Sequence, residues 1–284
     1  MNCYLCGSNQ YKVLPGKVRD RSDLDICECR DCHLVYLSSQ KHISNEHYQN
    51  SGMHGNSLPS IKTWLSETEV DDERRFQFLK ENIRGREVLD FGCGNGGFLL
   101  KSKEVASAVY GIELEKRLQE HFSVNQLSVW ENLELALHSN RKFDLITAFH
   151  VIEHISDPAD IITTLSKLLK PNGKMFFEIP SSSDVLLRLY ESKPFSEFTY
   201  WSQHLYLFNA SNLVKLVDKT GLTLNWIKQV QRYPLSNHLY WLSKGEPGGH
   251  IKWNFLNSDA LNSSYEASLA SLGMCDTLLF SVSI

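Results

Sequence analysis

The stretch VLDFGCGNGGFLL, residues 88–100, constrains the fold of this chain more than any other. A short apolar run contains Asp90, glycines follow at positions 92, 94, 96 and 97, and a second apolar run comes next. Glycine accepts backbone conformations that are closed to other residues, so it lets a turn approach a ligand closely. The first turn of a helix also favours negative charge. The stretch therefore predicts a strand, a tight ligand-binding turn and a helix, in that order.

Short runs of strand-forming residues recur along the chain and are separated by segments of helix length, which predicts a parallel, doubly wound α/β sheet. The runs are EVLDF (87–91), AVYGIE (108–113), FDLITAF (143–149) and KMFFEI (174–179). The helix after the third run is expected to begin at Asp157 and Pro158 and to stop at KPNG, residues 170–173. The final run, TLLFSVSI, is expected to be an antiparallel edge strand.

The cysteines are clustered, because five of the seven lie within the first 32 residues. Cys3 and Cys6 form one Cys-x-x-Cys pair, and Cys29 and Cys32 form another. This spacing predicts a zinc ribbon over residues 1–40, with Cys27 as a spare thiol. Five basic and five acidic side chains in residues 1–40 balance one another, which favours a structural or partner-contact role over nucleic-acid binding.

Composition places the chain among ordinary soluble proteins. The net charge is −4 and hydrophobic residues make up 42%, so neither disorder nor a general attraction to nucleic acid or anionic lipid is indicated. The chain has no apolar run long enough to span a membrane, and its first residues lack a signal-peptide layout, so we expect a cytoplasmic protein. We expect three parts: the ribbon (1–40), a connecting segment and helix over the active site (41–83), and a cofactor-binding domain (84–284).

Two known patterns fit the glycine turn. The spacing Gly92-x-Gly94-x-x-Gly97, with Glu113 after the next strand, fits the dinucleotide fingerprint. The whole string is more specific: VLDFGCGNG, then VYGIE, FDLITAFHVIEHISDP and LLKPNGKMFFEIP resembles the class I S-adenosylmethionine-dependent methyltransferases over roughly residues 60–284.

The resemblance implies a Rossmann-like, mostly parallel seven-stranded sheet with an antiparallel edge strand. It further implies that Asp90 and the turn hold the methionine part of S-adenosylmethionine and that Glu113 accepts from the ribose hydroxyls. Phe149 and His150 would border the cofactor. The cofactor residues implied in this way are Asp90, Gly92, Gly94, Gly96, Glu113, Phe149 and His150. With the ribbon included, the chain resembles bacterial zinc-ribbon methyltransferases, among them those of sugar and surface-polysaccharide biosynthesis.

His150, Glu153 and His154 stand at positions i, i+3 and i+4, so one helical turn would direct all three side chains to the same side. The turn HVIEHI resembles the Glu-x-x-Glu-His turn of ubiquinone-pathway and small-RNA O-methyltransferases, which binds a divalent ion; His150 replaces the first acid. We expect His150 or His154 to act as general base with Glu153 orienting it. Mg²⁺ or another divalent ion, held with His204, is the second interpretation, and a brace for the turn is the third.

Residues 231–253, read as a loop, mix aromatic side chains with histidines, a lysine and a Pro-Gly-Gly turn. Together with YQNSGMH (48–54) they are a candidate acceptor-site wall for a sugar or nucleotide-sugar, because aromatic faces stack on sugars. A lid or a contact between two copies of the chain is the alternative.

The leading hypothesis is O-methylation of a sugar or other small polar acceptor in surface-glycan biosynthesis. We expect no nucleic-acid partner and no membrane contact, and a homodimer stays open. The alternatives are an NAD-dependent sugar oxidoreductase or epimerase and a noncatalytic zinc-ribbon adaptor. The oxidoreductase would need a Tyr-x-x-x-Lys pair, but YESK (190–193) places the lysine one residue too early.

Overall fold

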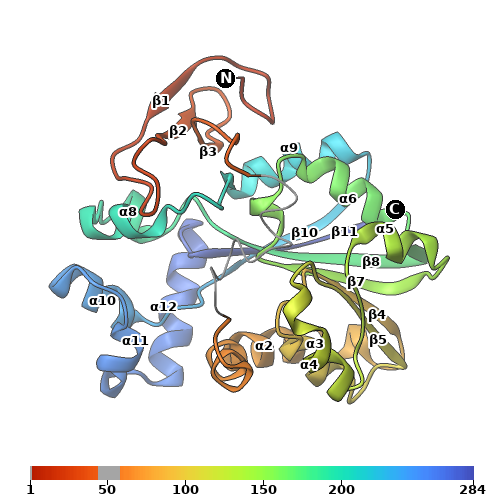
Figure 1. The fold of residues 1–284 in the computed structure, drawn as a ribbon. Coiled ribbons are helices and arrows are strands. Elements are labelled where there is room, and N and C mark those ends of the chain that lie inside the picture. The colour runs from red at the N-terminus through yellow and green to blue at the C-terminus, as the bar shows by residue number, and fades with distance from the viewer. Residues whose placement is uncertain (1, 44–57) are drawn as a thin grey trace.

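The computed structural model describes residues 2–43 and 58–284 of the chain. Its centre is a twisted sheet that has seven strands over these residues, in the order β10-β11-β8-β7-β4-β5-β6 (Figure 1). The strands β8, β7, β4, β5 and β6 run parallel, whereas β11 is antiparallel to both of its neighbours. In chain order the strands are β4 (Glu87–Phe91), β5 (Ala108–Ile112), β6 (Ser128–Trp130), β7 (Phe143–Phe149), β8 (Leu169–Pro180), β10 (Thr223–Val230) and β11 (Thr277–Ser283). This confirms the predicted Rossmann-like architecture.

One detail at the antiparallel edge differs from expectation. The final run of the chain, β11, lies one strand inside the sheet, and β10 is the outer strand. Six of the seven β11 residues are buried, whereas exposed and partly buried residues alternate along most of β10. A strand with both faces covered belongs inside a sheet, and polar side chains such as Lys228 protect an edge from further pairing.

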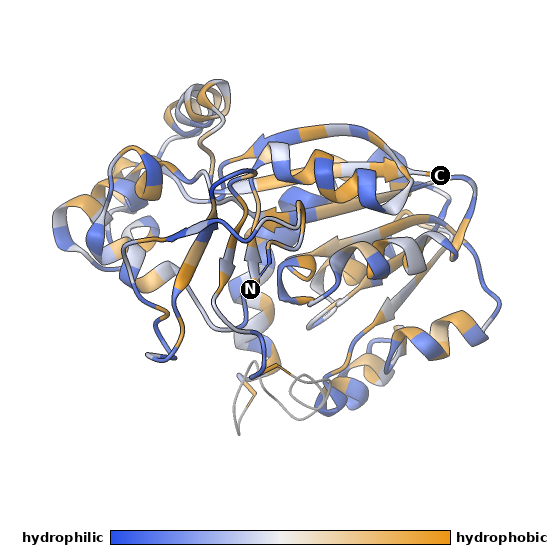
Figure 2. Cartoon of the chain, turned by 90° about the horizontal axis from the view of Figure 1, so that it is seen from above, coloured by the Kyte–Doolittle hydropathy of each residue, from blue (hydrophilic) through white to orange (hydrophobic). Residues whose placement is uncertain are grey.

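Helices cover both faces of the sheet (Figure 1). One face packs against α5 (Leu133–His138), α6 (Pro158–Ser166) and α9 (Ala210–Thr220). The other face packs against α2 (Ile61–Ile83), α3 (Gly97–Ser102) and α4 (Gln119–Val124), the last preceded by the 3-10 turn η1 (Lys116–Leu118). Apolar and polar residues alternate along these flanking helices, as Figure 2 shows, which is the pattern of helices with one buried side.

One local prediction is confirmed at a helix start, and one at a helix end is wrong. Ser60 caps α2, and the Asp157 side chain accepts from the Asp160 amide in front of Pro158. However, α6 ends at Ser166, and the KPNG stretch belongs to β8. Strands β7 and β8 change register between Phe143 and Leu145, and Asn172 has a φ of 65° there. The turn-forming residues therefore make an irregularity inside a strand instead of a helix stop.

Residues 2–43, here called the cysteine-rich segment, contribute three strands to a second, small sheet. Among the described residues this sheet has four strands in the order β1-β2-β3-β9. Its strands are β1 (Tyr11–Val13), β2 (Ile26–Cys29), β3 (Val35–Leu37) and β9 (Tyr206–Leu207). The fourth strand thus comes from the far part of the chain. One hydrophobic cluster continues from Leu34 and Tyr36 in this region to Phe177 and Leu216 against the central sheet.

Residues 231–253 are largely helical, so the prediction of a loop there is wrong. Two helices, α10 (Leu235–Lys244) and α11 (Gly249–Lys252), occupy most of the segment, and Gly245 ends the first in a left-handed conformation, with a φ of 68°. Its Tyr240 and Trp241 are buried, so packing of aromatic residues outweighs the turn signals. The remaining elements are α7 (Val185–Arg188), α8 (Lys193–Thr199), α12 (Asp259–Leu272), and the 3-10 turns η2 (Ile152–His154) and η3 (Asn254–Leu256).

Among the described residues, no helix combines the length and apolar content needed to cross a membrane.

Candidate active site

The glycine turn connects β4 to α3 at the carboxyl edge of the sheet. Gly92, Gly94 and Gly96 all have left-handed backbones, with φ of 72°, 52° and 77°. A Cβ atom at Gly92 would lie 2.5 Å from the Val151 side chain, so this position excludes any larger residue without a shift of the turn. The turn thus brings β4 close to the residues that follow β7.

Asp90 lies just before this turn and is buried, with 3% of its surface exposed. The Thr147 hydroxyl donates to its Oδ1 at 2.7 Å. Burial raises the pKa of Asp90 to about 7, because the charged carboxylate loses water and the Thr147 hydrogen bond offsets this only in part. A nearby cationic group would stabilise the charged form.

Glu113 follows β5 and reaches back to the same turn. Its Oε2 accepts from the Gly94 amide at 2.8 Å and its Oε1 accepts from the Glu115 amide at 2.9 Å. Burial raises the pKa of Glu113, although these amides oppose the shift. The Leu114 amide is a third backbone donor to this carboxylate, and a carboxylate with about four lone-pair sites keeps capacity for a ligand hydroxyl.

A cavity of about 280 Å³ opens over the turn. Five predicted cofactor residues line it, namely Asp90, Gly92, Gly94, Phe149 and His150. Gly96 and Glu113 are not among the lining residues. A Cβ atom at Gly96 would instead meet Leu127, at 2.9 Å, so this glycine allows close packing behind the turn.

The opposite wall of the cavity comes from α2, the helix that was expected to lie over the active site, although its charged residues were not predicted to face the ligand. Trp64, Asp71, Asp72 and Arg75 face the cavity, and the Arg75 guanidinium lies 4.7 Å from the centre of the Phe149 ring. Three acidic residues followed by two arginines in the helix, DDERR (71–75), were the signal in the sequence.

Glu178 near the end of β8 ties α2 to the sheet and is fully buried. It accepts from Arg74 at 2.8 Å and from Arg75 at 2.7 Å. Burial alone would raise the pKa of Glu178, but Arg75, His150 and Arg74 together hold it well below its usual value. A charged residue within the apolar run KMFFEI was the sequence signal for this buried ion pair.

His150 lies at the tip of β7 with a φ of 54°, in the left-handed region. Its Nδ1 is 3.3 Å from Glu153 Oε1, and its Nε2 is 3.1 Å from an Arg232 nitrogen and 3.3 Å from Glu178 Oε1. The Arg232 guanidinium can only donate and the Glu178 carboxylate can only accept, so these two contacts favour opposite protonation states of Nε2, while Nδ1 faces the Glu153 carboxylate.

Arg232 follows β10 and closes the cavity from a third side. It forms an ion pair with Asp71 of α2 as well as its contact with His150. The sequence analysis missed this residue, although it lies within the segment 231–253 that was expected to form an acceptor wall. Arg232 is the member of that segment that lines the cavity. The other part of the expected wall, YQNSGMH, lies outside the described residues.

Glu153, His154 and His204 form a second group behind His150. One ligand atom from each lies within 4.8 Å of the others, as in a site that could hold a metal ion. Glu153 Oε2 and His204 Nδ1 are buried and, among the described residues, have no hydrogen-bond partner. The three side chains do not line the cavity. The structure therefore brings all four predicted histidine-cluster residues together but places only His150 at the cavity.

Burial favours the neutral forms of the two histidines in this group. His154 Nδ1 donates to the Gln203 carbonyl at 2.9 Å, which leaves the lone pair on Nε2. Burial lowers the pKa of His154, and burial lowers the pKa of His204 to about 3. Neutral imidazoles are the form that binds metals.

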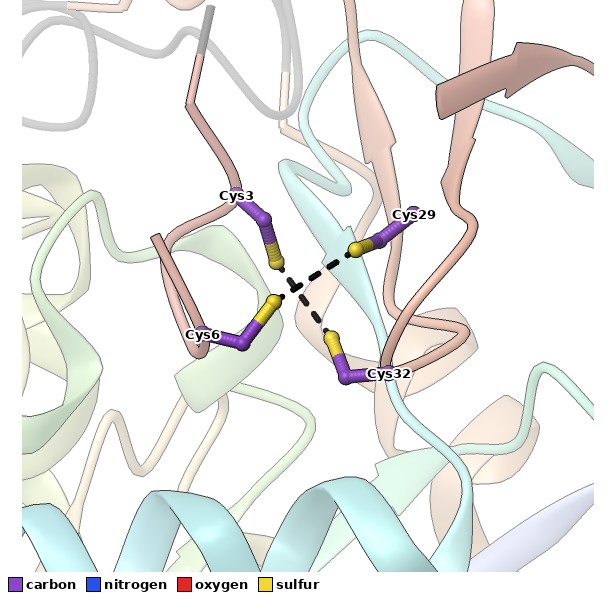
Figure 3. A group of neighbouring side chains, drawn as sticks. All are labelled: Cys3, Cys6, Cys29 and Cys32. Carbon is purple, nitrogen blue, oxygen red and sulfur yellow. Dashed lines mark hydrogen bonds between the residues drawn. The ribbon is translucent and has the colours of Figure 1, made fainter. Parts of the chain in front are cut away.

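Cys3, Cys6, Cys29 and Cys32 converge on one point between two loops, as Figure 3 shows. The sulfurs of Cys3 and Cys32 are 3.4 Å apart and those of Cys6 and Cys29 are 3.5 Å apart. A tetrahedral zinc ion with bonds of about 2.3 Å needs sulfurs about 3.8 Å apart. The cluster is therefore compatible with a zinc site, and Cys27 is a buried thiol outside it.

Comparison with known proteins agrees with this geometry. A family model described as a methyltransferase domain matches residues 65–225. A ubiquinone biosynthesis O-methyltransferase from Photobacterium profundum is 26% identical over 180 residues, covering 59% of this chain and 76% of that protein. The same enzyme from Leptothrix cholodnii is 28% identical over 206 residues, covering 64% of this chain and 86% of that protein.

A solved structure shares the fold. An S-adenosylmethionine-dependent methyltransferase from Archaeoglobus fulgidus superimposes with a TM-score of 0.51 at 16% identity, covering 78% of this chain and 98% of that one. The glycine turn, the cavity above it, and the family match over more than half of the chain lead to one conclusion. This chain belongs to the methyltransferase domain family and is a class I S-adenosylmethionine-dependent methyltransferase.

Proposed function

We propose that this methyltransferase acts on a hydroxyl oxygen of a small polar acceptor. The observation that carries the proposal is that one cavity has Asp90, Gly92 and Gly94 on one wall and His150 on another. The names of the relatives support oxygen as the methyl acceptor, because they are O-methyltransferases. The comparisons give no support to the sugar or surface-glycan acceptor expected from the sequence.

The donor half of the cavity suits S-adenosylmethionine, which supplies a methyl group on a positively charged sulfur when bound. The Glu113 carboxylate, which the Gly94 and Glu115 amides hold in place, would accept from a ribose hydroxyl of the donor. Asp90, whose pKa burial raises to about 7, would charge more readily beside the cationic part of the donor.

The acceptor half depends on His150. An attacking hydroxyl must lose its proton, and a neutral imidazole whose Nδ1–H faces Glu153 can accept that proton at Nε2. Arg232 occupies Nε2 in this structure, so the acceptor hydroxyl would replace Arg232 there. Glu153, fully buried, would stabilise the imidazolium that results.

A divalent cation at Glu153, His154 and His204 is a second proposal for the same site. It is supported by the unpartnered Glu153 Oε2 and His204 Nδ1. The His154 Nδ1–H that donates to a carbonyl is also typical of metal-binding histidines. A zinc ion held by the four ribbon cysteines is proposed on the convergence of their sulfurs.

Calorimetric titration with S-adenosylmethionine tests the donor site. We expect Glu113→Ala to weaken binding by at least about ten-fold, because hydrogen bonds to a charged group contribute about 1.5–3 kcal/mol each. The matched control is Glu131→Ala, an exposed glutamate near the same sheet edge, which should bind normally. Equal affinities in both variants would refute the assignment of Glu113.

Mass spectrometry of reactions with a catechol, a simple phenol and a panel of monosaccharides tests the acceptor. We expect an O-methylated product and a loss of at least about 100-fold in kcat for His150→Ala, as general bases contribute about 10²–10⁴-fold. A product methylated only on nitrogen or carbon, or full activity of both His150→Ala and His154→Ala, would contradict the proposal. Inhibition by a chelator that Mg²⁺ reverses would favour the cation at His154.

A further inference from the structure

Residues 200–205, here called the strap, contact the histidine group along one side. The Gln203 carbonyl accepts from His154 Nδ1 at 2.9 Å, and the Leu205 amide donates to the Glu153 carbonyl at 2.8 Å. The Trp201 ring meets His154 edge-on at a centroid distance of 6.2 Å. His204 itself belongs to the strap. The position of the strap thus sets both the tautomer of His154 and the place of His204.

The other side of the strap is held by the cysteine-rich segment. The Asp20 carboxylate accepts from the Ser202 amide at 2.9 Å and from the Ser202 hydroxyl at 2.6 Å. The Arg19 amide donates to the Tyr200 carbonyl at 3.0 Å, and the Arg19 guanidinium lies 5.0 Å from the centre of the Trp201 ring. His42 Nε2 donates to the Ser202 carbonyl at 2.7 Å.

The pairing then continues as regular structure, because β3 forms a ladder with β9 directly after the strap. The Leu37 amide also donates to the Leu205 carbonyl, at 3.3 Å. The strap itself contains neither helix nor strand. Buried backbone groups must find partners, and those of Tyr200, Ser202 and Leu205 find them mainly in the cysteine-rich segment.

We propose that the cysteine-rich segment is a positioning part of the active site, with Asp20 as its main contact residue. By fixing Ser202, Asp20 holds the Gln203 carbonyl against His154 and keeps His204 beside Glu153. The inference rests on the proposed catalytic role of the histidine group. None of residues 2–43 lines the donor cavity, so the segment acts on the methyl-transfer step and leaves donor binding unchanged.

The experiment compares Asp20→Ala with Asp23→Ala, the latter at an aspartate of the same loop that forms an ion pair with Arg21. For Asp20→Ala we expect unchanged S-adenosylmethionine affinity by calorimetry and a kcat lower by about ten-fold, since small misplacements of catalytic groups cost 10–100-fold. Asp20→Asn should restore most of the rate, because an amide can still accept from the Ser202 amide. Asp23→Ala should behave as wild type.

A readout that needs no turnover accompanies the kinetics. Hydrogen exchange of the amides of residues 202–205 should be faster in Asp20→Ala, while exchange in β4 and β7 stays the same. Nitrogen-15 NMR of labelled histidine should show His154 losing its single Nδ1–H tautomer. Ser202→Ala removes the hydroxyl contact but keeps the hydrogen bond from the residue 202 amide to Asp20, so it should give the same changes in exchange and tautomer, but smaller ones.

Unchanged strap exchange, an unchanged His154 tautomer and an unchanged kcat in folded Asp20→Ala would overturn the inference. An equal loss of donor affinity and rate would also overturn it, since that result would indicate general destabilisation. If the wild type methylates no hydroxyl acceptor, the proposed function fails, while the exchange and tautomer measurements still decide whether the segment positions the histidines.

Discussion

His150 carries an energetic cost at its backbone. A left-handed non-glycine residue costs on the order of 1–3 kcal/mol, and such residues persist where the surroundings over-determine them. Here the His150 amide donates to the Glu178 carbonyl at 2.7 Å, and the ring contacts Glu153, Glu178 and Arg232. Strain held by so many contacts is typical of a functional residue.

His204 makes the stability of the chain depend on pH. Burial lowers its pKa to about 3, whereas an exposed histidine in the unfolded chain titrates near about 6.5. Between these values the unfolded chain binds a proton that the folded chain does not, so stability is present above about pH 6.5 and is lost as the pH falls.

We therefore expect His204→Gln to flatten the pH dependence of unfolding between pH 6.5 and 4, by at most about 1.4 kcal/mol per pH unit. Urea unfolding at several pH values measures this slope. Parallel slopes in wild type and His204→Gln would contradict the burial of a neutral His204.

Helix α2 acts as the cover of the donor cavity at the scale of elements. Its Phe76, Leu79 and Ile83 pack against the sheet, and its first half presents charged side chains to the cavity. The Glu178 ion pairs with Arg74 and Arg75 attach the middle of the helix to the sheet, and Arg232 adds a second attachment through Asp71. Ion pairs therefore hold the part of α2 beside the cavity, and apolar packing holds its C-terminal part.

Glu178→Gln should destabilise the fold by about 3–5 kcal/mol, because loss of one partner leaves buried arginines without full compensation. The free energy of unfolding by urea measures the effect. Glu81→Gln, on the exposed side of the same helix beside Arg84, should change stability little. A small effect at Glu178 would show that water reaches the arginines and replaces the carboxylate.

The cysteine-rich segment and the central domain form one unit at the scale of the whole molecule. The Asn212 side chain of α9 donates to the Cys32 carbonyl at 2.6 Å, and Tyr4 donates to Asp157 at the start of α6, also at 2.6 Å. Glu28 of β2 pairs with Arg188 at 3.3 Å. Contacts this numerous predict that the two parts unfold together.

We expect a strong chelator to lower the Tm of the entire chain in a single transition and added Zn²⁺ to restore it, since metal bound only to the folded state stabilises it. Differential scanning calorimetry measures the transition, and elemental analysis should find one zinc per chain at the cysteines. Cys27→Ser should retain the zinc. A chelator that leaves Tm unchanged would contradict a structural zinc site.

The sequence by itself determined the architecture and the donor half of the site. Regularly spaced apolar runs predict parallel strands. The glycines after the first run predict a turn with left-handed backbone conformations that other residues rarely adopt, as Gly92 has. Local spacing likewise placed Asp157, the cysteine pairs and the cluster of His150, Glu153 and His154. Each of these signals is a pattern of residues that are close together in the sequence.

Only the tertiary structure decided which charged groups meet at the cavity and which lie behind it. Arg232, Asp71 and Glu178 are separated by up to 161 residues in the chain, and no local pattern links them. Nor does any local pattern show that β9 joins the cysteine-rich sheet or that β11 lies inside β10. Burial and charge compensation act between residues that are close in space, whereas secondary-structure signals act between residues that are close in the sequence. These pairings are therefore decided only when the whole chain has folded.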